Sequence, residues 1–271
     1  MSELEELAGV SRWFPHFRLQ SLTAGLTGLQ VIFFLVSLGL GTQDWNPATC
    51  SLYRLGGLFA ADVELRYEVQ RLVMPVLLHA NLLHLVVNVL FQLQVGFALE
   101  RYYGRVRFLL VFILSEMLGN LYAGWFDRYS VIVGASTGLF GLLGSQIAIF
   151  AYNWKEEDPR RLERLAVYGV SVFITFALSS LWPHCTRIGH LSSFLYGIML
   201  GFVLTRLRQS AWKWWVLRLL AVAGIVGATF WVLRQILHNR QFYDCAFLQY
   251  WDSNGDKKTA GDRCELMCSD Y

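Results

Sequence analysis

The stretch Gly134-Ala-Ser-Thr-Gly-Leu-Phe-Gly-Leu-Leu-Gly144 decides the fold of this 271-residue chain. It lies in an apolar run, residues 131–152, that is long enough to cross a bilayer, since one helical span needs about 20 residues. Glycines repeated along such a run allow a second helix to approach closely. Ser136 stands near the start of the run, where its hydroxyl is either a helix-packing group or a nucleophile. The rest of the chain supplies the partners that favour the nucleophile.

The composition is that of a membrane protein. The chain is 55% hydrophobic and only 16% charged, whereas a soluble domain carries about 25% charged residues. Its mean hydropathy is +0.41, so we expect the lipid bilayer as its surroundings. The net charge of +3 is dispersed, and no basic run indicates nucleic-acid binding. Residues 1–9 are acidic and resemble neither a cleaved signal nor a transit peptide, so we expect the first span to be retained.

Seven apolar segments predict seven transmembrane helices and an all-α, polytopic membrane helix bundle. Residues 42–70, between the first two segments, are too mixed to form a span. We expect a cytosolic segment at 1–20, one helical bundle over 21–238 and a tail at 239–271. The expected spans are 21–41, 72–98, 106–126, 131–152, 165–182, 188–206 and 213–237.

Charge in the loops orients this bundle. Cytosolic loops of membrane proteins carry an excess of Lys and Arg. Basic residues cluster in three connections, at 101–107, 155–164 and 206–213, while the opposite short loops hold only Arg128 and Arg187. This distribution predicts a cytosolic N-terminus and, after seven crossings, an extracytosolic C-terminus.

All five cysteines fall on the predicted outer face. Such a distribution suits an oxidising compartment, so we expect the protein in the secretory pathway or the plasma membrane. Because five is odd, at least one cysteine is free or pairs between molecules, and the sequence leaves the pairing open. The five are Cys50, Cys185, Cys245, Cys264 and Cys268.

Two possible metal sites find little support in the sequence. The tail segment 252–263 resembles the opening of a calcium loop, but lysine occupies the sixth position and arginine the twelfth. Zinc is the alternative for the tail, which lacks a Cys-x-x-Cys pair, and for His79 and His84, whose spacing of five is poor for shared ligation. We therefore expect no metal and no cofactor.

A base and oxyanion donors for Ser136 come from two other expected spans. His190 stands at the outer end of the sixth span, where an ionisable residue is by default a functional-site hypothesis. A serine becomes a good nucleophile when a base accepts its proton, and imidazole is the usual base. His84 and Asn88 share one face of the second span. With the backbone N–H of Ser136, they can stabilise an oxyanion, which predicts acyl-transfer chemistry.

These residues resemble the rhomboid family of intramembrane serine proteases. Seven spans with the additional one at the C-terminal end resemble the eukaryotic secretory-pathway type, which implies a six-helix core at 21–208 and an additional helix at 209–238. The resemblance covers about residues 70–205 in the family's order. Its motifs are His79-x4-His84-x3-Asn88, Gly134-x-Ser136, and His190 with Gly197 and Gly201, together with Arg71 and Glu100-Arg101 as further landmarks.

The resemblance implies a catalytic dyad of Ser136 and His190 that needs no carboxylate. It also implies that His84, Asn88 and Ser136 stabilise the oxyanion and that the substrates are single-span membrane proteins. Their helix would enter between the second and fifth spans and be cleaved near its outer end. The oligomeric state stays open. Supporting roles are implied for His79 in the first loop, Phe140 under the imidazole of His190, Gly134, Gly197 and Arg71.

Three positions depart from the family pattern. Thr137 stands where a glycine usually follows the serine, and Ser193 stands where a glycine usually lies three residues after the histidine. Both add atoms between spans four and six, where they either loosen the helix contact or add an interhelical hydrogen bond of about 0.6 kcal/mol. Gln70 replaces the tryptophan that usually precedes Arg71.

Two other functions are alternatives to this interpretation, and one pair of polar residues is not explained by it. The first alternative is a catalytically weak or inactive relative that binds transmembrane clients. The second is a transporter or channel, which the lack of an inverted repeat disfavours. Glu116 and Asn120 lie inside the third apolar run. We expect Glu116 to hydrogen-bond a neighbouring helix, with a catalytic role as the alternative.

Overall fold

The fold is a bundle of long helices, as seen in a computed structural model that describes residues 17–128, 130–154, 161–179, 187–205, 212–239, 249–251 and 257–259. Within these ranges the regular secondary structure is helical apart from two short hairpins and one isolated β-bridge, which confirms the predicted all-α membrane bundle. The long helices are α2 (Leu22–Leu40), α5 (Leu82–Tyr103), α6 (Arg105–Phe126), α7 (Ser136–Tyr152), α8 (Arg161–Ser179), α9 (Arg187–Leu204) and α10 (Trp212–Asn239).

Short elements fill the connection between α2 and α5, residues 41–81, which we call loop one. The segment 42–70 therefore does not span, as predicted. Loop one contains the β1–β2 hairpin (Thr42–Gln43 and Asn46–Pro47), α3 (Thr49–Arg54), α4 (Ala60–Arg66) and the 3-10 turns η1 (Val69–Leu72) and η2 (Met74–Leu77). A second hairpin pairs β3 (Gln249–Trp251) with β4 (Lys257–Thr259).

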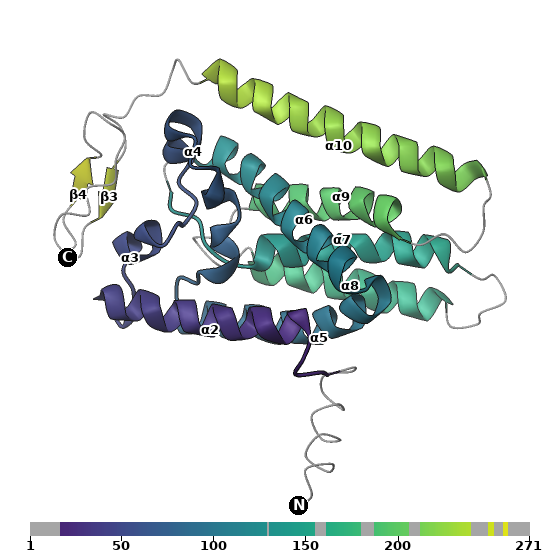
Figure 1. Ribbon diagram of the computed structural model, residues 1–271, viewed down its shortest axis with the longest axis horizontal. Coiled ribbons are helices and arrows are strands. Elements are labelled where there is room, and N and C mark those ends of the chain that lie inside the picture. The colour runs from purple at the N-terminus through teal and green to yellow at the C-terminus, as the bar shows by residue number, and fades with distance from the viewer. Residues whose placement is uncertain are drawn as a thin grey trace, which may run out of the picture.

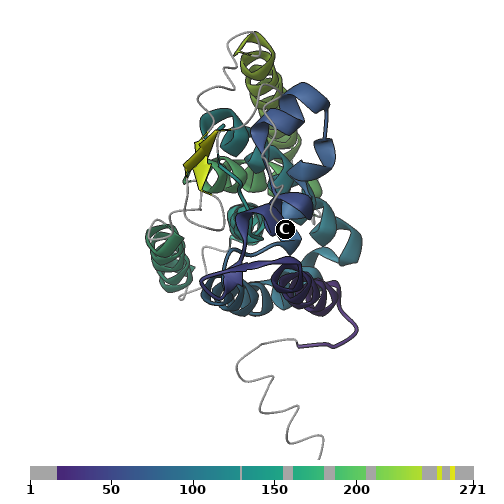
Figure 2. The ribbon, with the colours of Figure 1, turned by 90° about the vertical axis from the view of Figure 1, so that its left-hand side faces the viewer.

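The helices α6, α7 and α9 form the centre of the bundle (Figure 1). The α2–α5 pair lies on one side and α10 on the other, while α3 and α4 of loop one cover one end (Figure 1). Seen from that end, α8 stands at the edge of the bundle (Figure 2). The central helix is α7, with 10 of its 17 residues buried.

Length and composition identify most of these helices as membrane spans. Five of them, α2, α5, α6, α9 and α10, are long and apolar enough to cross a bilayer. Two shorter apolar helices accompany them, α7 itself and the segment Tyr168–Ala177 of α8. The protein is therefore a multi-pass membrane protein.

The second span begins later than the sequence predicted. We expected it at 72–98, but α5 starts at Leu82. Residues 72–81 form 3-10 turns and a loop because Pro75 fixes its backbone and lacks an N–H, and because Asn81 caps α5 with its side chain. The apolar side chains of this segment are largely buried against the bundle, which is why their hydropathy resembles that of a span.

The fourth span also begins later than its apolar run. We expected a span at 131–152, but α7 starts at Ser136. Ile132 instead forms an antiparallel bridge with Leu58 of loop one, with N···O distances of 2.9 and 3.0 Å. Gly134 has φ +125°, a conformation that favours glycine and ends any helix there. As a result Ser136 is the first residue of its helix.

Several predictions concern residues outside the described ranges. These are the N-terminal residues 1–16, the possible calcium segment at 252–256 and four of the cysteines. The fifth, Cys50 on α3, is disulfide-bonded. The four cysteines outside the described ranges are Cys185, Cys245, Cys264 and Cys268.

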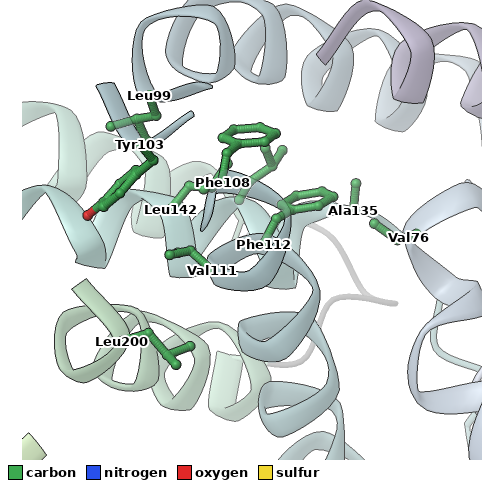
Figure 3. Packing of buried hydrophobic residues seen from close by; sticks show 10 residues of the cluster. Val76, Leu99, Tyr103, Phe108, Val111, Phe112, Ala135, Leu142 and Leu200 are labelled. Atoms are coloured by element: carbon green, nitrogen blue, oxygen red, sulfur yellow. The ribbon is translucent and has the colours of Figure 1, made fainter. Parts of the chain in front are cut away.

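A hydrophobic cluster fills the space between the central helices and α5 (Figure 3). Val111 and Phe112 of α6 are fully buried, and Leu142 of α7 is as well. Ala135 also belongs to this cluster, so the apolar core reaches the residue directly before Ser136. Further members are Val76, Leu99, Tyr103, Phe108, Leu139 and Leu200.

Glycines allow the backbones of α7 and α9 to touch. A Cβ atom added to Gly197 would lie 2.0 Å from the carbonyl oxygen of Gly141, and one added to Gly144 would lie 2.1 Å from the carbonyl oxygen of Phe194. A Cβ on Gly201 would lie 2.9 Å from the Cα of Ser145. The small residues thus set the distance between the two helices, as expected for membrane helix interfaces.

Replacing Gly197 by alanine should separate α7 from α9. The obstacle is backbone that cannot rotate aside, so we expect a loss at the upper end of the about 1–3 kcal/mol typical of overpacking. Thermal unfolding in detergent measures it. Gly28→Ala on α2, where nothing lies within 4 Å of an added Cβ, is the matched control. Equal unfolding midpoints for the two variants would contradict this packing.

Arg71 holds loop one together. Its guanidinium is buried, and Nη1 donates to the carbonyl oxygens of Tyr53 at 2.8 Å and Gly57 at 2.9 Å. Nη2 lies 3.3 Å from Asp62, and Nε donates to Glu68 at 2.6 Å. Burial raises the pKa of Asp62, and the neighbouring Arg71 opposes that shift. The single guanidinium of Arg71 therefore holds separate turns of loop one together.

Arg71→Ala should destabilise loop one strongly. The change leaves Asp62 buried without its main cation, and breaking such a pair typically destabilises by about 3–5 kcal/mol. Arg71→Lys keeps the charge but loses the planar set of donors, so its effect should be smaller. Unfolding in detergent and protease sensitivity within loop one measure both variants. An alanine variant as stable as the lysine variant would be inconsistent with this role.

Candidate active site

Ser136 and His190 lie in hydrogen-bond contact although 54 residues separate them. Ser136 Oγ is 2.8 Å from His190 Nε2. Ser136 is the first residue of α7, and His190 lies in the first turn of α9. The glycine contacts between these two helices bring the side chains to the same depth. The structure thus brings together the two residues that the sequence predicts to form a dyad.

Aromatic rings flank the imidazole of His190. Phe140, one turn after Ser136, stacks on it with ring centroids 4.4 Å apart and planes at 26°. Phe176 of α8 packs against Phe140 at 4.4 Å. Among the described residues, Nδ1 of His190 has no hydrogen-bond partner. The ring orientation therefore depends on stacking and on the serine, rather than on a carboxylate.

Gly134 makes room for His84 beside the nucleophile. A Cβ added to Gly134 would lie 2.7 Å from His84 Cε1 and 3.6 Å from Ser136 Oγ. The imidazole of His84, in the first turn of α5, therefore lies against the extended segment that leads to Ser136. Glycine is needed here for two reasons, the positive φ and this contact.

Asn88 lies one turn further along α5 and is buried. Its Nδ2 donates to the carbonyl oxygen of His84 at 2.9 Å, which uses one of the two amide hydrogens. His84 and Asn88 therefore share one face of α5, as the sequence predicts. The described contacts place His84, rather than Asn88, next to Ser136.

His79 lies in loop one, in the turn before α5, as the resemblance implies, although the span expected at 72–98 would have included it. Its ring is fully buried and contacts the ring of His84 edge to face, with centroids 5.2 Å apart. Burial, with a smaller contribution from His84, lowers the pKa of His79 to about 3. A neutral, buried imidazole that supports His84 fits the structural role implied for His79. No group of three or more potential metal ligands occurs in the described part of the chain.

The two departures from the family pattern meet at the contact of α7 and α9. Ser193 Oγ donates to the carbonyl oxygen of Thr137, and both residues are buried. Of the two consequences we considered, the structure therefore contains the interhelical hydrogen bond. The added atoms point toward Gly119 of α6, where an added Cβ would lie 2.5 Å from Thr137 Cγ2 and 2.7 Å from Ser193 Cβ.

Sequence analysis did not identify Gly119 as part of this site. Because Gly119 has no side chain, α6 leaves space at this point for Thr137 and Ser193. The available signal was the spacing of Ser115 and Gly119, a small-xxx-small pair in the third apolar run. A Cβ on Gly141 would lie 2.0 Å from Ser115 Cβ, so both residues of the pair are in close helix contacts.

Comparisons with known proteins identify the family of this chain. The model of the Rhomboid domain family matches residues 66–207. Rhomboid-like protease 1 of Toxoplasma gondii is 32% identical over 220 residues, which cover 79% of this chain and 74% of that protein. Rhomboid-like protease 3 of the same organism is 30% identical, covering 74% and 76%. Rhomboid-related protein 3 of Homo sapiens is 30% identical, covering 76% and 54%.

The matched region includes Ser136, His190 and all the other site residues described above. The family match spans more than half of the chain, and the relatives match it over about three quarters of its length. The chain belongs to the rhomboid family.

Proposed function

We propose that this chain is an intramembrane serine endopeptidase that uses Ser136 and His190 as a catalytic dyad. The observation that carries the proposal is the 2.8 Å contact between Ser136 Oγ and His190 Nε2. A nucleophile within hydrogen-bond reach of a base is the geometric signature of covalent acyl transfer. The names of the two Toxoplasma gondii relatives, which are called proteases, support the same reaction class.

The reaction begins when Ser136 Oγ attacks the carbonyl carbon of a peptide bond. His190 Nε2 takes the hydroxyl proton and then gives it to the leaving amine, so that an acyl-serine remains. Water, activated by the same imidazole, hydrolyses the acyl-serine and restores the hydroxyl. Stacking on Phe140 keeps the ring in the orientation that both proton transfers need.

The start of α7 supplies an oxyanion site. Ser136 is the first helical residue, so its backbone N–H is one of the donors that a helix leaves without an internal partner. His84, which lies against the segment before Ser136, can donate from its imidazole, and Asn88 has a second amide hydrogen. Hydrogen-bond donors that are already aimed at the oxyanion stabilise its charge most strongly where water is excluded.

The proposed substrate is a single-span membrane protein whose helix unwinds near its outer end. Substrate residues that weaken a helix, such as glycine, favour that unwinding. The entry route we propose lies between α5 and α8. It is supported by the position of α8 at the edge of the bundle (Figure 2). Among the described contacts, α8 is held to the centre by few groups, including Phe176 and the hydroxyl of Tyr168, which donates to Leu143 O at 2.7 Å.

We propose a location in the secretory pathway or the plasma membrane, with the N-terminus in the cytosol and the C-terminus outside it. The basic clusters in three connections support this orientation. The disulfide at Cys50 supports an oxidising environment for loop one. Since loop one covers the end of the bundle where α5 and α7 begin, cleavage would take place toward the outer face.

Ser136→Ala and His190→Ala should each reduce cleavage of a fluorescent transmembrane substrate by at least about 1,000-fold, because each removes a group that the other needs. The assay uses purified full-length protein in proteoliposomes. A fluorophosphonate probe reports the nucleophile directly and should label wild type but neither variant. Ser145→Ala is the matched control. Ser145 lies on the same helix, and its hydroxyl donates a hydrogen bond to the carbonyl oxygen of Leu142. Labelling of Ser145→Ala should therefore persist.

Cleavage that persists in Ser136→Ala would overturn the dyad and indicate another nucleophile. A folded wild-type protein that neither cleaves nor reacts with the probe would favour the client-binding relative instead.

Gly119→Ala should destabilise the site through Thr137 and Ser193. An added Cβ overlaps both side chains, so we expect a loss of about 1–3 kcal/mol and a lower cleavage rate. In a Thr137→Ala, Ser193→Gly background these two obstacles are absent and the carbonyl oxygen of Gly189, 2.9 Å from the added Cβ, remains, so the same change should have a smaller effect. A thermodynamic cycle of unfolding and cleavage measures this coupling. Strictly additive effects would show that Gly119 does not compensate for these residues.

A further inference from the structure

A carboxylate is buried inside the central part of the bundle. Glu116 lies in the middle of α6 and is fully buried, and Asn120, one turn later, is 1% exposed. An ionisable group within a span is costly unless it serves a purpose. The dyad mechanism proposed above does not use either residue.

Glu116 hydrogen-bonds the first turn of α7, as expected for a contact with a neighbouring helix. Its Oε2 accepts the backbone N–H of Gly138 at 2.5 Å, and its Oε1 accepts a hydrogen from Asn120 Nδ2 at 2.9 Å. The same amide donates to the carbonyl oxygen of Leu72 at 2.9 Å. A continuous chain of hydrogen bonds therefore runs from the first turn of α7 to loop one.

This contact replaces a missing helix cap. The N-cap residue of α7 is Ala135, which makes no side-chain cap hydrogen bond. Gly138 is the third helical residue, and its N–H is one of those that a capping Ser, Thr, Asp or Asn would accept. Glu116 provides that acceptor from a different helix.

The turn that Glu116 caps begins with Ser136. On the other side of Ser136, the N–H of Gly134 donates to the carbonyl oxygen of Pro75 at 3.0 Å. Loop one therefore holds the nucleophile from both sides, directly through Pro75 and indirectly through Asn120 and Glu116. Fraying of this turn would move Ser136 Oγ and its backbone N–H together.

We propose that Glu116 and Asn120 are positioning residues for the nucleophile, acting through the first turn of α7 and its link to loop one. This inference rests on the proposed protease function. The hydrogen bonds described for the carboxylate go to Gly138 and Asn120 and not to the dyad. The carboxylate acts by keeping Ser136 Oγ within reach of His190 and the Ser136 N–H aimed at the oxyanion.

A second buried carboxylate offers a matched control. Glu100 of α5 accepts the backbone N–H groups of Leu22 and Thr23 at 2.9 Å each, at the start of α2. Glu100 therefore caps the start of α2 as Glu116 caps the start of α7. Glu100 lies sixteen residues beyond His84 on α5, about 24 Å at 1.5 Å per residue. Loss of either carboxylate should reduce stability, but only loss of Glu116 should disturb the nucleophile.

The experiment compares full-length wild type with Glu116→Ala, Glu116→Gln, Asn120→Ala and Glu100→Ala in proteoliposomes. Three quantities are measured: kcat and KM on a fluorescent transmembrane substrate, the rate of fluorophosphonate labelling, and amide hydrogen exchange of the peptide that covers 135–140. Rates are normalised to the folded fraction. Glu116→Gln keeps one acceptor for Gly138 but cannot also accept from Asn120, so it tests rescue if the alanine variant folds poorly.

We expect Glu116→Ala to lower kcat and the labelling rate about 10- to 100-fold, the effect of a small misplacement of reacting groups, with KM within about twofold of wild type. Asn120→Ala should lower kcat and the labelling rate by a smaller factor. Glu116→Gln should have kcat and a labelling rate close to those of wild type. Exchange at 135–140 should accelerate in Glu116→Ala. The Glu100→Ala variant should unfold more easily yet keep wild-type kcat, labelling rate and exchange in this peptide.

Labelling of Glu116→Ala at the wild-type rate, or an equal loss in Glu100→Ala, would overturn the positioning role. Hydrogen exchange separates this outcome from a failure of the proposed function. If wild type neither cleaves nor labels, the protease proposal fails, and the exchange of the α7 turn still decides whether Glu116 and Asn120 hold it.

Discussion

The backbones of α7 and α9 touch, and most of the site depends on that contact. A single added carbon at Gly197 would fall 2.0 Å from a carbonyl oxygen of α7, a distance that leaves no room for any side chain. Only because the two helices come this close can short side chains at their first turns meet, as Ser136 and His190 do at 2.8 Å. Between helices in lipid, tight van der Waals packing of this kind is a main source of association.

The close contact of α7 and α9 also limits where larger side chains can fit between them. Thr137 and Ser193 lie between α7 and α9, yet they do not force these helices apart, because α6 presents Gly119 toward them. Their hydrogen bond then adds to the contact. Three helices share this point, so the space available to each of the three residues depends on the other two helices.

Two buried carboxylates on the long helices have a common task. Glu100 accepts N–H groups at the start of α2, and Glu116 accepts one at the start of α7. Backbone donors at a helix end need a partner when they are buried in the protein, so an acceptor from a neighbouring helix stabilises both the donor and the helix contact. At α7 the same solution orders the turn that bears Ser136, which links an ordinary requirement of membrane folding to the proposed chemistry.

The residue order along the chain was sufficient to predict the membrane helices and their approximate number, and it identified Ser136 and His190 as a pair that the structure brings together. Hydropathy and glycine spacing are local properties, and the site motifs are short. Tertiary structure decided where α5 and α7 begin, because buried loop-one residues such as Val76 and Leu78 are as apolar as a span but pack against protein. It also placed His79 in a turn and assigned Glu116 and Gly119 their partners. Those contacts join different helices, and no local pattern states which helix faces which.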